Sequence, residues 1–482
     1  MDRLLNSRIA EYLVYLILLI FTGLIFSWGI NHSILEHHAF RQTQTASNIL
    51  WRIQEGIFSN ISPVSLPPWQ MPRELPLYQF IVTCICKLFE LKIEFAARIV
   101  SISFFYASCL LVHRISTEIH KDKITRIILL TLFSLSPVYL FWSRTCMIES
   151  TALFFSLLFI LQVLRWDHNS NISSLFFIVI GIIAALVKIT TYLPFFLVSI
   201  FYLTIIRRYS LLCRRLIGIY SPIIISIIGW YIYCRYSVKA DFIYSESNQE
   251  GYDWISNIHK NIFNPRFHGT LFWEIAFLVL PVSFYLIFGF VHSENKFNKF
   301  LLISFFSTTF VFSNLYLVHD YYIYGSGLLI LFYLSEKISM FLSDKSNIFK
   351  YLTIITLILI GCLNYINNGY FNFQKKNIKV HKELVDYTKE IAGNGLIIGT
   401  YLDTTIPYLL QKKCVTLGNY KGHNDYLKTT LTKIKDHCAK HDHLIKFCIM
   451  KNDQNFTHVK HLSDNLFGTS QYVVFDQYTV LH

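Results

Sequence analysis

Long apolar runs recur from one end of the chain to the other, and they constrain the fold more than any other feature of the sequence. Each run is about 17 residues or longer, which is enough to cross the hydrocarbon layer of a bilayer as a helix. Only 15% of the 482 residues are charged, whereas a soluble domain carries about 25%. The chain is therefore expected to be an integral membrane protein. We expect the first run, at about 11–30, to remain as a membrane helix, because no small-residue signal cleavage site follows it.

The runs predict a mainly α, polytopic membrane fold with about eleven transmembrane helices. An odd number of crossings places the two ends of the chain on opposite sides of the membrane. The expected spans lie near residues 11–30, 95–115, 124–142, 147–164, 172–187, 189–206, 214–234, 271–291, 299–317, 322–340 and 350–368.

The distribution of charge sets the expected orientation. The formal net charge is +13, and most lysines and arginines fall in alternate short loops between the expected spans. The short loops of the other set hold little beyond Arg144 and Lys188. By the positive-inside rule the basic loops are cytoplasmic, so the amino terminus is predicted inside, and the loop at 31–94 and the tail outside. Topology accounts for the basic residues, and nucleic acid is therefore not expected as a partner.

Two regions outside the spans are predicted to be structured. In the first outer loop, 31–94, apolar spacing indicates helices at 42–58 and 76–90, separated by a proline-rich turn. The tail, at 371–482, has shorter apolar runs and predicts a small extracytoplasmic α/β domain. The chain thus divides into a transmembrane domain at 1–370 and this tail. In the tail we expect helices at 378–392, 404–412 and 423–438, and strands at 395–400, 444–450 and 471–476.

Ionisable residues beside membrane spans are costly and mark function by default. Here nearly all of them fall at the outer end of an expected helix, although they come from five or more separate segments. Their shared depth predicts one site at the outer face of the membrane. The members are Glu36, His37, His38 and Arg41; Arg73 and Glu74; Arg98; Arg144 and Glu149; Lys188; and His319 and Asp320, with Tyr321 and Tyr322 beside them.

The mixture of side chains indicates the substrate. The cations Arg41, Arg144 and Lys188 suit a phosphate or diphosphate. A carboxylate, Glu36 or Glu74, suits a general base that takes a proton from an acceptor hydroxyl. A phosphate-bearing lipid together with a base describes sugar transfer from a polyprenyl carrier. The other side chains expected to contact substrate are His37, His38, Gln44, Glu149, His319, Tyr321 and Tyr322.

Several of these stretches resemble the GT-C glycosyltransferases, and more narrowly the bacterial family-39 branch related to protein mannosyltransferases and lipid A aminoarabinose transferases. The match covers the membrane part, in the same order and at the same helix ends. It rests on EHHAFRQTQTA at 36–46, PPW at 67–69, ELPLYQ at 74–79, FAARIVS at 95–101, WSR at 142–144, IES at 148–150, VKITT at 187–191 and HDYY at 319–322.

The resemblance implies a polyprenyl-phosphate sugar donor and attack by a hydroxyl of a lipid, glycan or protein acceptor at the outer face of the bacterial cytoplasmic membrane. It also implies a carboxylate base in the first outer loop. Glu74 resembles a family position that helps to bind a divalent metal ion, so a metal cofactor is an open expectation. The chain departs from the common pattern at Gln44, where many relatives carry an acid. The nearest acids are Glu36 and Glu74, and the sequence does not choose between them.

Other interpretations stay open at this point. Glu36 and Glu74 could be loop carboxylates paired with Arg41 or Arg73. A transporter or flippase for lipid-linked sugars would place its charges near the midplane and show two related halves, and neither is evident in the sequence. A polysaccharide ligase or polymerase shares the outer-face chemistry. A non-catalytic relative is a further alternative, because of Gln44.

Overall fold

The fold was analysed in a computed structural model. It describes residues 8–59, 74–120, 122–167, 169–209, 214–236, 254–279, 296–367, 374–392, 396–399, 404–416, 445–451, 472–475 and 478–481. Arg73, the turn at 67–69 and the helix expected at 423–438 lie outside the described residues.

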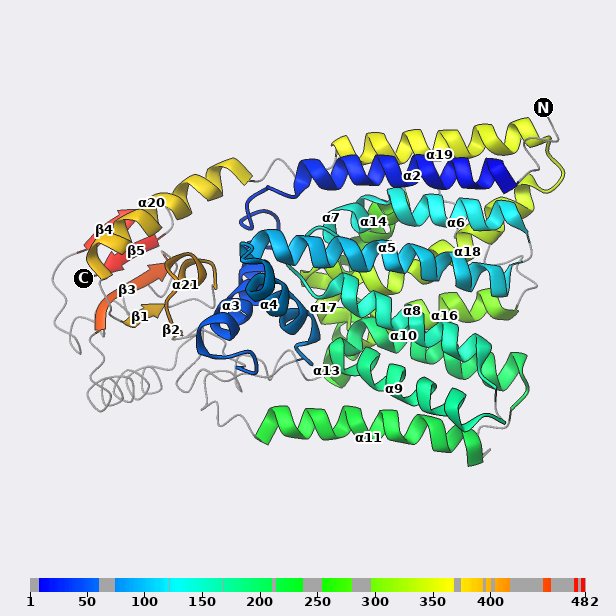
Figure 1. Cartoon of the computed structure of the whole chain (residues 1–482), viewed down its shortest axis with the longest axis horizontal. Helices are drawn as coiled ribbons and strands as arrows, with labels where there is room; N and C mark the ends of the chain where they lie inside the picture. Colours follow the sequence, from blue (N-terminus) through cyan, green and yellow to red (C-terminus); the bar gives the residue numbers. More distant parts are fainter. Residues whose placement is uncertain are drawn as a thin grey trace.

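Helices running side by side form the membrane part of the molecule, and the tail lies at one end of them (Figure 1). The expectation of a mainly α, polytopic membrane protein is confirmed. These helices are α2 (Arg8–Gly29), α5 (Ile93–Ile119), α6 (Lys123–Leu135), α7 (Pro137–Trp142), α8 (Glu149–Arg165), α9 (Asn171–Val187), α10 (Ile189–Phe201) with the π-helical turn η1 (Tyr202–Ile206), α11 (Arg214–Tyr236), α14 (Pro265–Val279), α16 (Lys296–Val311), α17 (Ser313–Val318), α18 (Ile323–Leu342) and α19 (Asn347–Asn367).

Five described helical segments are long and apolar enough to cross a bilayer, and several others are apolar but shorter. The count of eleven crossings therefore stays a prediction. The five segments are Glu11–Gly29, Ile93–Ile119, Ile189–Ile206, Arg214–Cys234 and Asp320–Leu342.

Two of the expected spans are not single helices, and those two predictions were wrong. The span at 124–142 is divided into α6 and α7 at Ser136, whose backbone is extended with φ −61° and ψ 129°. Pro137 is the reason, because a proline disfavours the helical conformation in the residue before it and removes a backbone donor. The span at 299–317 is divided into α16 and α17 at Phe312, where φ is −104° and ψ is 30°.

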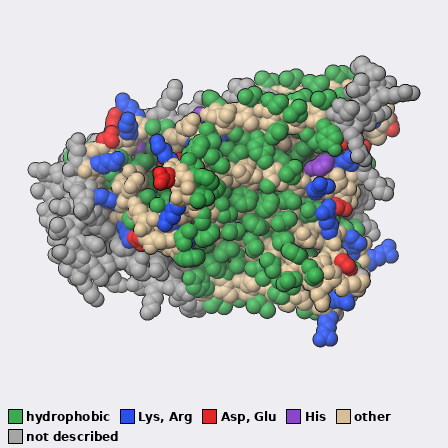
Figure 2. All heavy atoms as spheres, viewed as in Figure 1, with side chains coloured by type: hydrophobic (Ala, Val, Ile, Leu, Met, Phe, Trp, Pro, Cys, Tyr) green, Lys and Arg blue, Asp and Glu red, His purple; other side chains and the backbone are tan. Residues whose placement is uncertain are grey.

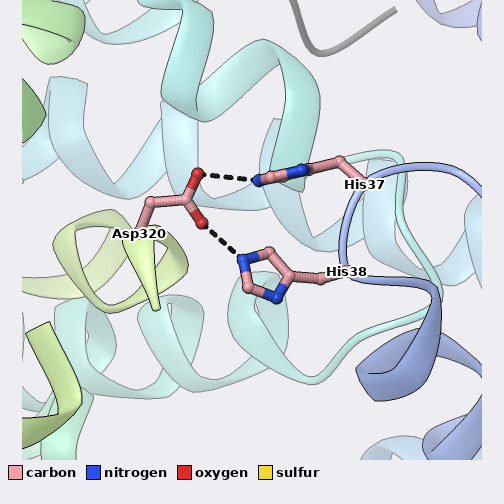
Figure 3. Close-up of side chains that lie close together, drawn as sticks. All are labelled: His37, His38 and Asp320. Atoms are coloured by element: carbon pink, nitrogen blue, oxygen red, sulfur yellow. Dashed lines mark hydrogen bonds and ion pairs between the residues drawn. The ribbon is translucent and has the colours of Figure 1, made fainter. Parts of the chain in front are cut away.

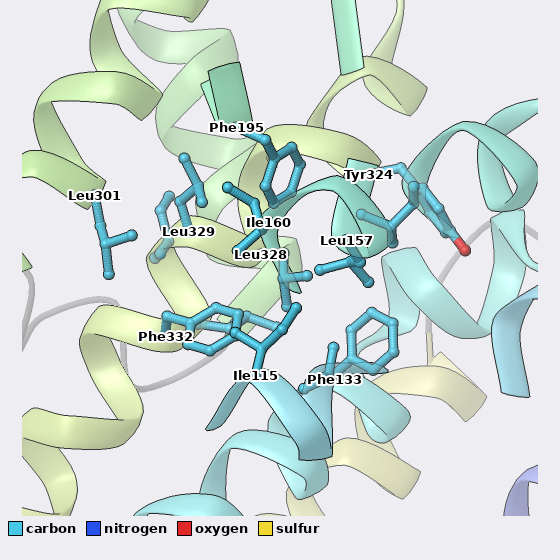
Figure 4. Packing of buried hydrophobic residues seen from close by; sticks show 14 of the residues in the cluster. Ile115, Phe133, Leu157, Ile160, Phe195, Leu301, Tyr324, Leu328, Leu329 and Phe332 are labelled. Carbon is cyan, nitrogen blue, oxygen red and sulfur yellow. The ribbon is translucent and has the colours of Figure 1, made fainter. Parts of the chain in front are cut away.

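Leucine, isoleucine and aromatic side chains fill the interior of the bundle (Figure 4). Phe133 and Leu157 are among those fully buried. Many leucines and isoleucines on the outer faces of α2, α11 and α19 are exposed instead, and hydrophobic side chains cover much of the middle of the molecule in Figure 2. Exposed apolar surface of this extent suits contact with lipid tails rather than water.

The first outer loop folds into two helices at the end of the bundle. They are α3 (Ala39–Glu55) and α4 (Leu77–Phe89), close to the expected 42–58 and 76–90. Their apolar faces form a second core with the start of α5. Polar side chains of α3, among them Gln42 and Thr43, are also buried, which indicates that α3 is enclosed on more than its apolar face.

The described part of the tail is α/β, as expected. Its elements are α20 (Gln374–Ala392), β1 (Leu396–Gly399), α21 (Thr405–Leu410), β2 (Cys414–Thr416), β3 (Ile445–Lys451), β4 (Tyr472–Phe475) and β5 (Tyr478–Leu481). The strand order is β2-β1-β3-β5-β4, with β1 parallel to both neighbours and the last two pairs antiparallel. Strands β2 and β5 were not predicted from the sequence.

The tail is attached to the membrane part through α21, which packs against α3. The Thr404 hydroxyl donates to the backbone oxygen of Phe40 at 2.7 Å and lies 2.8 Å from the Thr43 hydroxyl. Tyr408 donates to a carboxylate oxygen of Glu94 at 2.5 Å. The tail therefore holds the first turn of α3 from the side opposite the bundle.

Close packing between α18 and α10 gives a first testable prediction. A Cβ added at Gly325 would lie 2.7 Å from Thr191 Cγ2 and 3.1 Å from its Cα, so Gly325→Ala is expected to destabilise the protein by about 1–3 kcal/mol. Gly218→Ala in α11 is the matched control, because no described atom lies within 4 Å of its added Cβ. Thermal unfolding in detergent compares the two, and equal midpoints would contradict this packing.

Candidate functional site

The turn that precedes α3 places two consecutive histidines on one side of the chain. His38 is the N-cap of α3 and has left-handed backbone angles, φ 53° and ψ 42°, which are uncommon for residues other than glycine. The turn is packed against α7: the rings of His37 and His38 have centroids 5.7 and 5.6 Å from that of Trp142. Both imidazoles are therefore held against a buried aromatic side chain.

Asp320 meets both histidines from a distant part of the chain. It begins η2 (Asp320–Tyr322), a short 3-10 turn before α18. His37 Nε2 lies 3.0 Å from its Oδ2 and His38 Nε2 lies 3.0 Å from its Oδ1 (Figure 3). This is the group of histidine, cysteine and acidic side chains that could hold a metal ion among the described residues. Glu74, the position suggested by resemblance, is not part of it.

Arg41 lies one turn further along α3 and is paired with Glu74. Its Nη2 donates to Glu74 Oε1 at 2.8 Å, and its Nη1 donates to the side-chain oxygen of Gln44. Burial is the largest single influence and works against the charged form, but Glu74, Tyr321, Tyr322 and Glu149 together outweigh it, and the pKa of the Arg41 guanidinium is raised above its ordinary value. Arg41 is thus a cation held in contact with Glu74 and Gln44.

Lys188 lies in the short break between α9 and α10, and its ammonium group is bonded to the Glu149 carboxylate. Its Nζ lies 4.6 Å from the centre of the Tyr322 ring and 5.0 Å from that of Tyr321. A backbone hydrogen bond of 2.7 Å, from the nitrogen of Leu75 to the oxygen of Leu186, ties the Glu74 segment to the end of α9. The two ion pairs therefore belong to adjoining segments.

Glu36 occupies a separate, closed position. Its carboxylate lies 3.0 Å from Arg144 Nη2 and 3.3 Å from Arg98 Nη2, and at most 1% of any of the three side chains is exposed. Arg98 also donates to the backbone oxygens of Ile30 and Ser33. This cluster joins the end of α2, the start of α5 and the turn between α7 and α8. Its contacts are those of a structural support.

The predicted site residues therefore fall into two groups. The structure brings Arg41, Gln44, Glu74, Glu149 and Lys188 together with Tyr321 and Tyr322. His37 and His38 lie beside this group, on Asp320. Glu36 and Arg144 instead form the buried cluster. His319 lies beside the first group, with its ring stacked on that of Tyr321. Burial, His38 and Arg41 lower the pKa of His319 to about 4, so its imidazole is neutral at physiological pH.

Two acids were not among the substrate contacts predicted from the sequence. Asp320 stood among the ionisable residues but not among the expected substrate contacts, although it joins both histidines. Glu274 in α14 is buried, and neither carboxyl oxygen has a hydrogen-bond partner among the described residues. The sequence could have identified Glu274 as a candidate functional residue, because it is an acid inside the span expected at 271–291.

Comparison with known proteins bears on the fold. No protein-family model matches the chain, and no curated sequence matches it. Its fold is shared with two solved structures of ArnT from Cupriavidus metallidurans. The structure bound to undecaprenyl phosphate has a TM-score of 0.63 at 12% identity and covers 97% of each chain. The apo structure has a TM-score of 0.60 at 11% identity and covers 98% of each. The expected mainly α, polytopic membrane fold is thereby confirmed, and its architecture is that of the ArnT structures.

Proposed function

We propose that this membrane protein is a glycosyltransferase that moves a sugar from a polyprenyl-phosphate carrier to a hydroxyl of a lipid, glycan or protein acceptor. The observation that carries the proposal is the meeting of Arg41 and Lys188 around Tyr321 and Tyr322, in a fold shared with ArnT. One of the two ArnT structures holds undecaprenyl phosphate. We infer a carrier lipid of the same class for this chain.

The lipid phosphate would be bound by Arg41 and Lys188. A guanidinium group has five N–H donors and an ammonium group has three. The contacts described above use two donors of Arg41 and one of Lys188, which leaves donors on both cations for phosphate oxygens. Arg144 was also expected here. We leave it out of the phosphate site, because its side chain is fully buried against Glu36.

Glu74 is the carboxylate that we assign as general base. The acceptor oxygen attacks the anomeric carbon of the sugar, the bond from that carbon to the phosphate oxygen breaks, and polyprenyl phosphate leaves. The acceptor proton passes to the Glu74 carboxylate. The side chain of Glu74 is 27% exposed, whereas that of Glu36 is fully buried. This difference favours Glu74 over Glu36 as the group that an acceptor can reach.

We place the reaction at the outer face of the bacterial cytoplasmic membrane, with the amino terminus in the cytoplasm. Arg165, the last residue of α8, and Arg207, directly after η1, are exposed, and lysine and arginine side chains line the end of the molecule away from the tail as well as the surface near the tail (Figure 2). The positive-inside rule makes that end cytoplasmic. The tail and the site near α3 are then extracytoplasmic.

Binding of the carrier alone gives the first test. Undecaprenyl phosphate added to the detergent-purified protein is expected to raise its unfolding temperature in a concentration-dependent manner. Arg41→Gln should reduce this shift at every lipid concentration, while Arg208→Gln, beyond η1, should leave it unchanged. An equal shift in all three proteins would show that the lipid binds elsewhere.

Turnover in detergent separates the proposal from a transporter. Purified protein is supplied with labelled polyprenyl-phosphate sugars and a membrane extract as the source of acceptors. A transferase releases free polyprenyl phosphate and labels an acceptor, although there is no membrane to cross. A protein that binds the carrier but leaves every donor intact would be a transporter or a non-catalytic relative.

A further inference from the structure

We propose that His37, His38 and Asp320 form a binding site for one divalent transition-metal ion, with zinc as the first candidate. Each histidine Nε2 lies 3.0 Å from a different oxygen of the Asp320 carboxylate, and the three ligand atoms lie within 4.8 Å of one another. Ligand atoms around a tetrahedral zinc ion are roughly 3.3 Å apart, given bonds of about 2.0–2.2 Å. The two 3.0 Å contacts with Asp320 are close to that spacing.

The backbone brings these three groups together in an unusual way. Side chains of consecutive residues point in different directions in a helix or a strand, yet the rings of His37 and His38 both face one carboxylate (Figure 3). The left-handed conformation of His38 makes this possible. Asp320 comes from a segment more than 280 residues later in the chain. Two distant segments therefore converge on one point.

The chemistry of the donors fits such an ion. Two imidazoles and one carboxylate are a ligand set of catalytic zinc sites, which keep a fourth position for water or substrate. The two neighbouring cations have carboxylate partners of their own, since Arg41 is paired with Glu74 and Lys188 with Glu149.

His319 supplies a second observation at the same place. Its ring centroid lies 5.5 Å from that of His38, and its buried Nδ1 has no hydrogen-bond partner among the described residues. Ligating histidines usually have outer-shell hydrogen-bonding groups around them. A buried imidazole nitrogen without a partner among the described residues is a suitable neighbour for a bound ion and its water.

A hydrogen-bonded triad without metal is the competing explanation, and the two differ in protonation. In the hydrogen-bonded triad each Nε2 carries a proton and donates it to Asp320. In the metal site each Nε2 is unprotonated and directs its lone pair at the ion. Metal binding by the full-length protein therefore decides between the two, and it is measured without any sugar donor.

The first experiment is metal titration of the full-length protein after chelator treatment. One equivalent of Zn²⁺ is expected to bind. Even the loss of an outer-shell partner weakens metal binding 10–100-fold, so Asp320→Asn and His38→Gln are each expected to weaken it by more than about 100-fold. His113→Gln is the matched control, because His113 lies towards the other end of α5 beside Tyr15. Zinc affinity that is equal in all four proteins would place the ion elsewhere and overturn the proposal.

A second variant tests the site by the gain of an absorption band instead of a loss of metal affinity. In His38→Cys the thiolate would bind Co²⁺ and produce a sulfur-to-cobalt charge-transfer absorption band. The wild type with Co²⁺ should lack that band. A folded His38→Cys protein without the band would overturn the proposal. Stoichiometric metal binding without sugar transfer would support the metal site and contradict the proposed function. Sugar transfer without metal binding would support the proposed function and contradict the metal site.

Discussion

Replacing Lys188 with methionine is expected to lower the rate of sugar transfer roughly 10²–10³-fold, the loss that follows removal of one preorganised charge-stabilising group. Its ammonium group is held by Glu149 and by the faces of Tyr321 and Tyr322. In the proposed reaction it faces the phosphate as the bond between the anomeric carbon and the phosphate oxygen breaks and polyprenyl phosphate leaves. Methionine keeps much of the length of the side chain and removes the charge. Initial rates at saturating donor measure the effect.

The single variant also leaves the Glu149 carboxylate buried without its cation, which destabilises the protein. Lys188→Met combined with Glu149→Gln removes both charges, and this double variant is expected to regain thermal stability while remaining inactive. Loss of activity is then separated from loss of fold. Wild-type turnover by the double variant would show that neither charge takes part in the reaction.

Glu36→Gln is expected to act on stability, and it should lower stability more than Glu74→Gln does. The substitution leaves Arg98 and Arg144 buried together without their shared anion, and breaking a buried ion pair in this way costs about 3–5 kcal/mol. The three side chains are at most 1% exposed. A lowered midpoint of unfolding in detergent, measured alongside the wild type, is the expected result.

Glu74→Gln is the matched comparison, since the sequence offered the two carboxylates as equal candidates. The Arg41–Glu74 pair is partly exposed, at 14% and 27%, and such pairs contribute about 0–1 kcal/mol. Glu74→Gln should therefore unfold close to the wild type and lose transfer activity. The opposite result, a stable and inactive Glu36→Gln beside a fully active Glu74→Gln, would move the base to Glu36.

Much of the fold was predictable because burial in lipid has a direct signature in sequence. An apolar run has to satisfy its backbone hydrogen bonds internally, and it therefore forms a helix. The ends of α5 and α9 fall close to the expected ends for this reason. The breaks are less visible: Pro137 marks one of them, whereas no residue type announces the one at Phe312. Strands β2 and β5, of three and four residues, were not predicted, whereas β1 and β4, of four residues each, were.

The candidate site was predictable in its location but not in its pairings. A charged residue at the end of a membrane helix indicates its depth in the membrane. This depth was the only reason for predicting Glu36 and Glu74 in one site. The structure separates them, because Arg98 and Arg144 surround one carboxylate and Arg41 meets the other. Which cation a carboxylate meets depends on how α3, α5 and the turn before α8 pack. No local pattern in the sequence encodes those contacts.

The attachment of α21 to α3 has a consequence for the turn that carries Arg41. The turn that carries Arg41 lies between the bundle and the tail, where the hydroxyl groups of Thr404 and Thr405 contact that of Thr43. Any swing of that turn away from the bundle would have to part these threonines first. The tail therefore restrains the turn that carries Arg41, and in the proposed reaction a change in the tail would act on this turn without replacing any group that handles the phosphate.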